Sequence, residues 1–262
     1  MEGNMWIFAT LGLLLCWMMP VDSMEGGASS KVAKKAIQLS MVEDSVDDMY
    51  LGCNDIMMTL KKDKSASELI GKEFIGTTSI GTDPFVTKIF NERNDKDLTI
   101  DHILAIYLYT GNNVYAEFNT AVRTEGRSYL SSFKYGSFHY LLTSAIQILN
   151  NNRSCYSTFR RTNVLFEGTV GEIIRFGSFT STSFSSDLKG YGTETCFKIK
   201  TCLGASLKNY SAKPKEEEVL IPPYEMFKIT EINREKKNPD LKDCEVVFVL
   251  ESAGGQELSE LQ

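Results

Sequence analysis

The hydrophobic pattern of the chain changes from a helical period to a strand period near Cys155, and this change most constrains the fold. Before it, apolar residues recur at helical spacing in residues 98–108, 115–123 and 138–149, which predicts three helices. A less regular helical pattern covers residues 31–62. Helices that precede a run of strands are typical of an α+β fold.

The second half of the chain consists of short segments rich in β-branched and aromatic residues, which favour strands. We expect strands at residues 155–160, 173–180, 195–201, 218–221, 227–232 and 246–250. The chain has 262 residues, of which 42% are hydrophobic, so it is long enough to bury a full core. Its formal net charge of −6 argues against binding of nucleic acid or of a membrane surface by bulk electrostatics.

An apolar run at residues 5–19 has the length of a signal peptide and is too short for a membrane span. We therefore expect residues 1–23 to be a cleaved signal peptide, no transmembrane segment, and a secreted protein. Residues 24–44 are expected to be partly helical or flexible. Residues 253–262 are expected to be a flexible polar tail without the hydrophobic stretch that a lipid-anchor signal requires.

Secretion brings the cysteines into an oxidising compartment, where pairing is favoured. An odd number remains after the signal peptide: Cys53, Cys155, Cys196, Cys202 and Cys244. No cysteine has zinc-ligand spacing and the only histidines are His102 and His139, so we expect no metal site and no serine protease triad. Sequons at Asn152 and Asn209 fit an extracellular glycoprotein.

A run of three carboxylates, residues 216–218, leads directly into an apolar segment that ends at two prolines. Because the side chains of a strand alternate, Glu216 and Glu218 are expected on one face, about 7 Å apart. Two such carboxylates suit a reaction at a sugar carbon with a cationic transition state, because one stabilises the charge while the other orients the nucleophile. Isolated charge runs are usually solvated, so this interpretation depends on the rest of the chain.

Two upstream segments complete a constellation with these glutamates. Arg160 lies in Phe-Arg-Arg-Thr, and Ser181 follows 21 residues later in Thr-Ser-Thr-Ser. Together they resemble the Arg, Ser-Thr-Ser and Glu-x-Glu motifs of the vertebrate arginine-specific ecto-ADP-ribosyltransferases, which are relatives of cholera-type toxins. Framework segments resemble that family as well: Tyr-Thr-Gly at 109–111, Glu-Phe-Asn-Thr-Ala-Val-Arg at 117–123, Phe-His-Tyr-Leu-Leu-Thr at 138–143, Phe-Gly-Ser-Phe at 176–179 and Lys-Thr-Cys-Leu-Gly at 200–204.

The resemblance implies an ADP-ribosyltransferase fold over residues 45–252, with a mixed β-sandwich core around an NAD cleft and an N-terminal helical lobe. It implies transfer of ADP-ribose from the co-substrate NAD to arginine side chains of extracellular or cell-surface proteins. Nicotinamide would be released, without a metal, by a monomer that binds no nucleic acid. The alternatives are an enzyme that mainly hydrolyses NAD and a catalytically weak binding module of the same fold.

The resemblance also assigns roles to four residues. Arg160 would bind the pyrophosphate of NAD through its planar guanidinium. Ser181 would order Glu218 and contact the nicotinamide ribose. Glu218 would stabilise the cationic charge as nicotinamide leaves. Glu216 would bind the acceptor guanidinium and help to deprotonate it, which is required because that group is protonated at neutral pH.

Further residues are expected around the cleft. Tyr109 is a candidate to contact NAD, and Phe184 and Tyr191 are candidates to pack against the nicotinamide. Tyr210 would be an aromatic platform for the acceptor arginine or an ordinary exposed tyrosine. Arg161 stands where the family usually has glycine. It would lend only backbone groups to the nicotinamide amide, or its side chain would crowd the pocket.

The disulfide pattern follows from the same resemblance. Cys155 is expected to pair with Cys202, and Cys53 with Cys244. Cys196 would then remain a free buried thiol, with intermolecular pairing as the alternative.

Overall fold

Helices occupy the first half of the chain in the computed structural model, which describes residues 35–52, 84–111, 114–152 and 154–255. The α-helices are α3 (Pro84–Glu92), α4 (Ile100–Thr110), α5 (Tyr115–Thr124) and α6 (Gly136–Leu149). Three of them confirm the predicted helices, whereas α3 was not predicted. The helical expectation for residues 31–62 is wrong for residues 35–52, which form no helix; the rest of that range lies outside the described residues.

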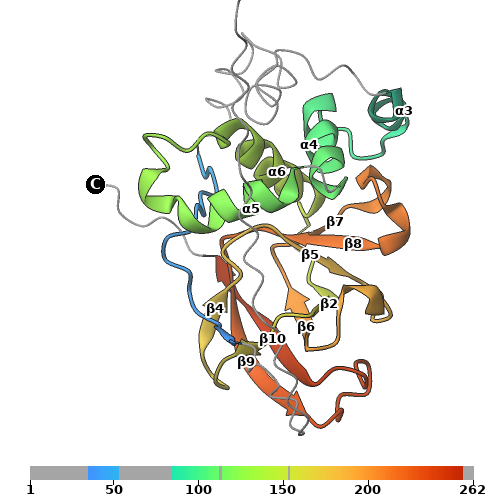
Figure 1. The fold of residues 1–262 in the computed structure, drawn as a ribbon. Coiled ribbons are helices and arrows are strands. Elements are labelled where there is room, and N and C mark those ends of the chain that lie inside the picture. The colour runs from blue at the N-terminus through green and yellow to red at the C-terminus, as the bar shows by residue number, and fades with distance from the viewer. Residues whose placement is uncertain (1–34, 53–83, 112–113, 153, 256–262) are drawn as a thin grey trace, which may run out of the picture. The chain divides into compact units, whose positions relative to one another are not determined.

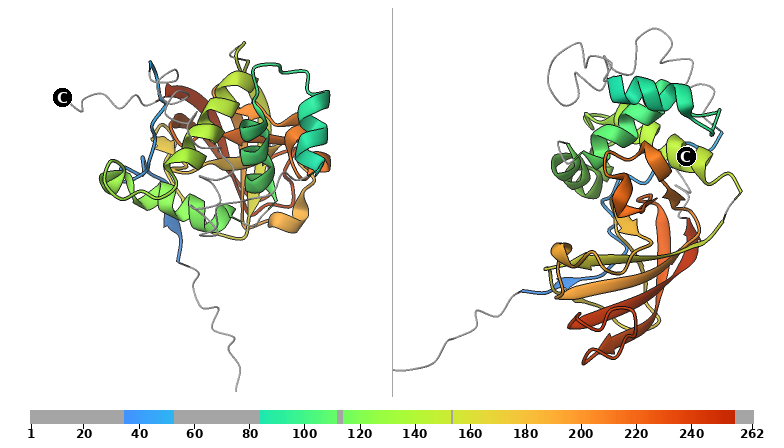
Figure 2. Two further views of the ribbon diagram at one scale, coloured as in Figure 1. Left: turned by 90° about the horizontal axis from the view of Figure 1, so that it is seen from above. Right: turned by 90° about the vertical axis from the view of Figure 1, so that its right-hand side faces the viewer.

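Strands and short turns occupy the second half. The strands are β1 (Ile37–Gln38), β2 (Tyr156–Thr162), β3 (Phe166–Glu167), β4 (Ile173–Arg175), β5 (Thr180–Ser183), β6 (Thr195–Thr201), β7 (Ala205–Ser206), β8 (Glu218–Ile221), β9 (Glu225–Arg234) and β10 (Val246–Gly255). The short 3-10 helices are η1 (Gly126–Ser128), η2 (Lys189–Tyr191), η3 (Lys208–Tyr210) and η4 (Pro214–Glu216). Figures 1 and 2 show the helices gathered on one side of the strands, so the predicted α+β class is confirmed.

Eight strands form one mixed sheet in the order β4-β9-β10-β6-β2-β5-β8-β7, with β10 parallel to β6. A single residue pair, Phe159 with Ser183, joins β2 to β5, and β8 runs across the direction of β9 and β10 (Figure 1). Ile221 of β8 is buried in the same cluster as Phe197 of β6 and Phe227 of β9. The sheet therefore folds over its own core, which is the predicted sandwich.

The predicted strand at residues 173–180 is divided into β4 and β5. Gly177 lies between them with φ 68°, and a Cβ atom there would come within 2.5 Å of the Val42 side chain. A left-handed backbone with no space for a side chain requires glycine. The break lets β4 pair with β9 while β5 pairs with β8.

The N-terminal segment belongs to the fold over its described part. Strand β1 runs parallel to β3, and Ser40 forms a bridge with Arg175. The buried Arg175 side chain forms an ion pair with Asp47 and donates to the Met41 carbonyl at 2.7 Å. Residues 37–42 are therefore held against the sheet, where the sequence predicted a partly helical or flexible segment.

Among the described residues, two disulfides join segments at or beside the strands. Cys155 pairs with Cys202, as predicted. Cys244 pairs with Cys196, so the prediction of a Cys53–Cys244 bridge and a free Cys196 is wrong; Cys53 itself lies outside the described residues. The parallel register of β6 and β10, which sets Cys196 opposite Val247, brings the two cysteines together.

Across the described ranges, no helix has the length and apolar character needed to cross a membrane.

Candidate active site

A cavity of about 770 Å³ lies between the helical layer and the sheet. Its wall includes the end of α4, one side of α5, strands β2 and β5, and the N-terminal segment around β1. Seven of the residues predicted for the site line it: Tyr109, Arg160, Arg161, Ser181, Tyr191, Glu216 and Glu218. The fold thus brings together residues that are up to about a hundred positions apart in the sequence.

Arg160 lies within β2 and is half-buried. Its Nη1 donates a hydrogen bond to the Ser181 carbonyl at 2.7 Å, which fixes the guanidinium across the β2–β5 junction. Burial lowers the pKa of Arg160, and nearby Tyr109, Tyr115 and Glu218 oppose this effect. Because its hydrogen-bond partner is a neutral carbonyl, the positive charge is available to an anionic ligand.

Glu218 is the first residue of β8 and is only 6% exposed. The Ser211 hydroxyl donates to its Oε2 at 3.1 Å, and the Ser181 hydroxyl also bonds to the carboxylate. Burial raises the pKa of Glu218, while these two hydrogen bonds lower it and the charge of Glu216 raises it. Glu218 is therefore a desolvated carboxylate held in one orientation, which strengthens its interaction with a positive charge.

Glu216 does not share a strand with Glu218, so the predicted strand geometry is wrong. Glu216 ends η4, and Glu217 adopts a left-handed conformation with φ 46° and ψ 49° before β8 begins. This turn, and not strand alternation, brings both carboxylates to the cavity. Pro214 opens η4, and proline at a first helical position is a signal that marks such a turn in the sequence.

Tyr191 ends η2, is half exposed, and donates a hydrogen bond to Glu216 Oε1 at 2.7 Å. Burial raises the pKa of Tyr191 to about 12, helped by its hydrogen bond to Glu216. Lys213 Nζ lies 3.8 Å from the same carboxylate oxygen. The structure therefore connects Tyr191 to the second carboxylate, whereas the sequence placed it beside the nicotinamide.

Residues 39–243 match the family model of NAD:arginine ADP-ribosyltransferases. The chain belongs to this family. It is 32% identical to the erythroblast NAD(P)(+)–arginine ADP-ribosyltransferase of Gallus gallus, over 86% of this chain and 77% of that protein. It is also 32% identical to the GPI-linked NAD(P)(+)–arginine ADP-ribosyltransferase 1 of Homo sapiens, over 78% of this chain and 69% of that protein.

Solved structures of ADP-ribosyltransferases share the fold. The crystal structure of the eukaryotic mono-ADP-ribosyltransferase ART2.2 superposes with a TM-score of 0.63 and 29% identity, covering 86% of this chain and 98% of that one. A mutant of that enzyme in complex with NADH gives a TM-score of 0.61 at 27% identity, with 86% and 97% covered. The predicted ADP-ribosyltransferase fold is confirmed.

Two of the tyrosines predicted for the site are buried. Tyr210 is 4% exposed, donates to Asp95 Oδ2 at 2.8 Å, and packs in the core of the helical lobe. Both interpretations of Tyr210, as a platform for the acceptor arginine and as an ordinary exposed tyrosine, are therefore wrong, because the side chain at the end of η3 is buried. Tyr109 is 2% exposed and donates to the Phe179 carbonyl at 2.9 Å, so it forms part of the cavity wall.

The sequence did not predict the cavity residues of α5, two of which make polar contacts there. Arg123 Nη2 donates to the Ser178 hydroxyl at 2.6 Å, and Asn119 donates to the Tyr109 hydroxyl at 3.0 Å; both line the cavity. Partial burial lowers the pKa of Arg123, and the neighbouring charge of Arg160 lowers it further. Asn119 and Arg123 are four residues apart, which places them on one face of a helix. This spacing is the sequence signal from which they could have been predicted to lie together.

Proposed function

We propose that this protein transfers ADP-ribose from NAD to arginine side chains of proteins outside the cell and releases nicotinamide. The main support for the proposal is that two carboxylates, Glu218 and Glu216, line the same cavity as Arg160. Membership of the arginine-specific transferase family supports the same reaction.

Arg160 and Arg123 would hold the pyrophosphate of NAD. Both guanidinium groups line the cavity, and their planar forks suit the paired oxygens of a phosphate. Arg160 is oriented by the Ser181 carbonyl and Arg123 by the Ser178 hydroxyl. These neutral partners leave both positive charges for the ligand, so the residues present fit NAD as a co-substrate.

Glu218 would act on the bond that breaks. NAD supplies a ribose carbon that becomes positively charged as nicotinamide leaves. Glu218 would accept a hydrogen bond from a ribose hydroxyl and stabilise that charge at short range. The Ser181 and Ser211 hydroxyls hold the carboxylate in place, so little reorganisation accompanies the reaction.

Glu216 would act on the acceptor. An arginine guanidinium is protonated at neutral pH and is a poor nucleophile, so a carboxylate must bind it and remove its proton. Glu216 stands at the cavity with the Tyr191 hydroxyl on one of its oxygens. The second oxygen then remains for the incoming guanidinium.

The setting would be extracellular. The apolar run at residues 5–19 fits a secretory signal, and two disulfides suit an oxidising compartment. The sequon residues Asn152 and Asn209 are exposed, so they are accessible for glycosylation. We extend the catalytic domain from β1 to Gly255, since residues 37–40 and 42 line the cavity and residues 253–255 belong to β10 and not to the expected polar tail.

Purified protein incubated with labelled NAD and agmatine, an arginine analogue, tests the proposal. We expect ADP-ribosylated agmatine and an equal amount of nicotinamide, both lost in the Glu218→Gln variant. Nicotinamide release without any agmatine adduct would show NAD hydrolysis instead. NAD binding without nicotinamide release would show a binding module.

A further inference from the structure

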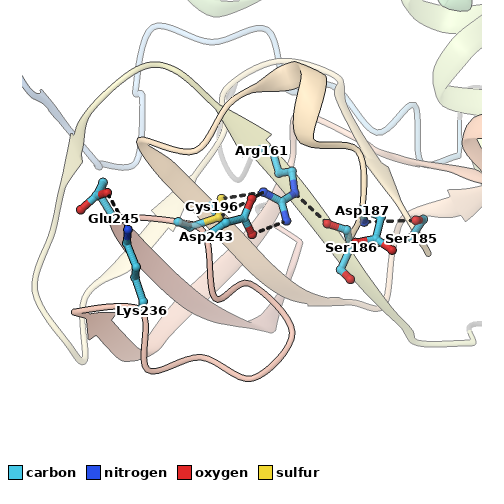
Figure 3. A network of polar contacts seen from close by, with 9 residues as sticks. Arg161, Ser185, Ser186, Asp187, Cys196, Lys236, Asp243 and Glu245 are labelled. Carbon is cyan, nitrogen blue, oxygen red and sulfur yellow. Dashed lines mark hydrogen bonds and ion pairs between the residues drawn. A yellow bond between two sulfur atoms is a disulfide. The ribbon is translucent and has the colours of Figure 1, made fainter.

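Arg161 has a buried side chain that joins three segments distant in sequence. Side chains alternate along β2, so Arg161 leaves the strand on the face opposite to that of Arg160, and its side chain is 3% exposed. Its Nε donates to the Ser186 carbonyl at 2.7 Å. Its Nη1 and Nη2 donate to the two carboxylate oxygens of Asp243 at 2.8 and 3.0 Å (Figure 3).

Residues 184–191, here called the tyrosine loop, connect β5 to Tyr191. Most of this loop is exposed. In the described part of the chain, the hydrogen bonds of residues 185–190 other than that of Ser186 span only two or three positions. The bond from Arg161 to Ser186 is thus the long-range anchor in the middle of the loop.

The other side of the guanidinium is attached to a rigid point. Asp243 precedes Cys244, whose disulfide with Cys196 ties this turn to β6. Cys196 is the register partner of Arg161 across β2 and β6, and Arg161 Nη1 lies 3.4 Å from the Cys244 sulfur. A cation held bidentately against a disulfide-linked turn has little freedom, so its third contact fixes Ser186 relative to the sheet.

We propose that Arg161 is a positioning residue for the acceptor side of the reaction. By anchoring the tyrosine loop, it holds the Tyr191 hydroxyl on Glu216 and keeps that carboxylate oriented toward an arginine acceptor. Arg160 and Glu218 do not depend on the tyrosine loop for their contacts. The inference rests on the proposed function, and it explains how arginine is accommodated at this position: the side chain is used on the far face of β2.

The first variant, Arg161→Lys, separates the two contacts. Lysine keeps a cation for Asp243 but lacks the planar fork that reaches Asp243 and Ser186 together. We expect the ratio of agmatine transfer to NAD hydrolysis to fall about tenfold or more, with the rate of hydrolysis within about twofold of wild type. Tyr191→Phe should lower the same ratio. In the double variant, Arg161→Lys with Tyr191→Phe, the ratio should be no lower than in Tyr191→Phe alone, because both changes act on the hydrogen bond from Tyr191 to Glu216.

Lys198→Gln is the matched control. Lys198 of β6 pairs with Asp240 at 2.7 Å, so its removal breaks an ion pair to the same turn without touching the tyrosine loop. We expect the transfer ratio of this variant to equal that of wild type. An equal loss in Lys198→Gln and Arg161→Lys would assign the effect to general stability and overturn the proposal.

Amide hydrogen exchange gives a readout that does not need activity. In Arg161→Lys, the amides of residues 184–191 should exchange faster than in wild type, while Lys198→Gln should show no change there. If the exchange of this loop is unaltered in Arg161→Lys, the proposal fails. A second outcome separates the two proposals. If exchange rises in Arg161→Lys but the wild-type protein transfers no ADP-ribose to agmatine, then Arg161 does anchor the tyrosine loop, whereas its role in acceptor positioning and the proposed function are both wrong.

Discussion

At the scale of single residues, Glu218 and Glu216 serve different steps because their surroundings differ. Glu218 is buried and held by serine hydroxyls, whereas Glu216 is partly exposed and held by Tyr191. Glu218→Gln should reduce both nicotinamide release and transfer by about a hundredfold to a thousandfold, since the transition state loses its counter-charge. Glu216→Gln should abolish transfer but keep NAD hydrolysis, because water needs less activation than a guanidinium.

Parallel assays of nicotinamide release, with and without agmatine, measure this difference. If the two variants lost both activities to the same extent, the separate roles of the two carboxylates would be wrong.

A second residue-scale prediction concerns the pH dependence set by Ser211. Burial raises the pKa of Glu218, and the hydrogen bond from Ser211 partly lowers it. Protonated Glu218 has no charge, so kcat/KM should fall as the pH falls through this pKa, which lies above the usual 4.5. Ser211→Ala removes a bond to the charged form and should move this acid limb to higher pH.

Ser211 also completes the Asn209 sequon, so Asn209→Gln is the control. It removes the sequon, and the pH at which kcat/KM falls on the acidic side should be the same as in wild type. A Ser211→Ala profile identical to that of Asn209→Gln would mean that the hydroxyl does not tune Glu218.

At the scale of elements, helix α4 carries Tyr109 into the cavity wall and depends on its first turn. Thr99 forms a capping box with His102: its hydroxyl accepts from the His102 amide, and its own amide donates to His102 Nδ1 at 3.0 Å. Thr99→Ala should lower the free energy of unfolding by about 1 kcal/mol, as measured by urea denaturation. Thr124→Ala, which removes an exposed hydroxyl bonded within α5, should change it by less than about 0.5 kcal/mol. Equal effects of the two changes would argue against the capping box.

At the scale of the whole molecule, a buried histidine makes stability depend on pH. His139 of α6 bonds to the Tyr50 hydroxyl at 2.9 Å and the Val46 carbonyl at 3.2 Å, and so ties the N-terminal segment to the helical lobe. Burial lowers the pKa of His139 from 6.5 to about 4. The unfolded chain therefore takes up a proton below about pH 6.5, while the folded protein does so only near pH 4.

Stability should consequently fall as the pH falls from 6.5 to 4, by ~3 kcal/mol from this residue alone. Urea denaturation across this range, compared with His139→Asn, measures the contribution. The variant should be less stable at pH 7 but should lose less with falling pH. Parallel pH profiles of the two proteins would contradict this assignment.

Local patterns predicted much of the fold and of the site. Helices α4, α5 and α6 follow from apolar residues at helical spacing, although only α5 buries a single face, whereas α4 and α6 are buried on nearly all sides. Strands β6 and β8 begin and end where they were predicted. The sequence motifs also predict Arg160, Ser181, Glu216 and Glu218 as site residues, and the structure brings them to one cavity.

Features that depend on which segments become neighbours were decided only by the tertiary structure. Cys196 pairs with Cys244 because β6 lies parallel to β10, and no local pattern encodes that register. Tyr210 is buried where the segment between α3 and α4 supplies Asp95 as a partner. Arg161 binds Ser186 and Asp243, which stand 25 and 82 positions away. Periodicity reports which face of an element is buried, whereas the partner on that face is set by the packing of the complete chain.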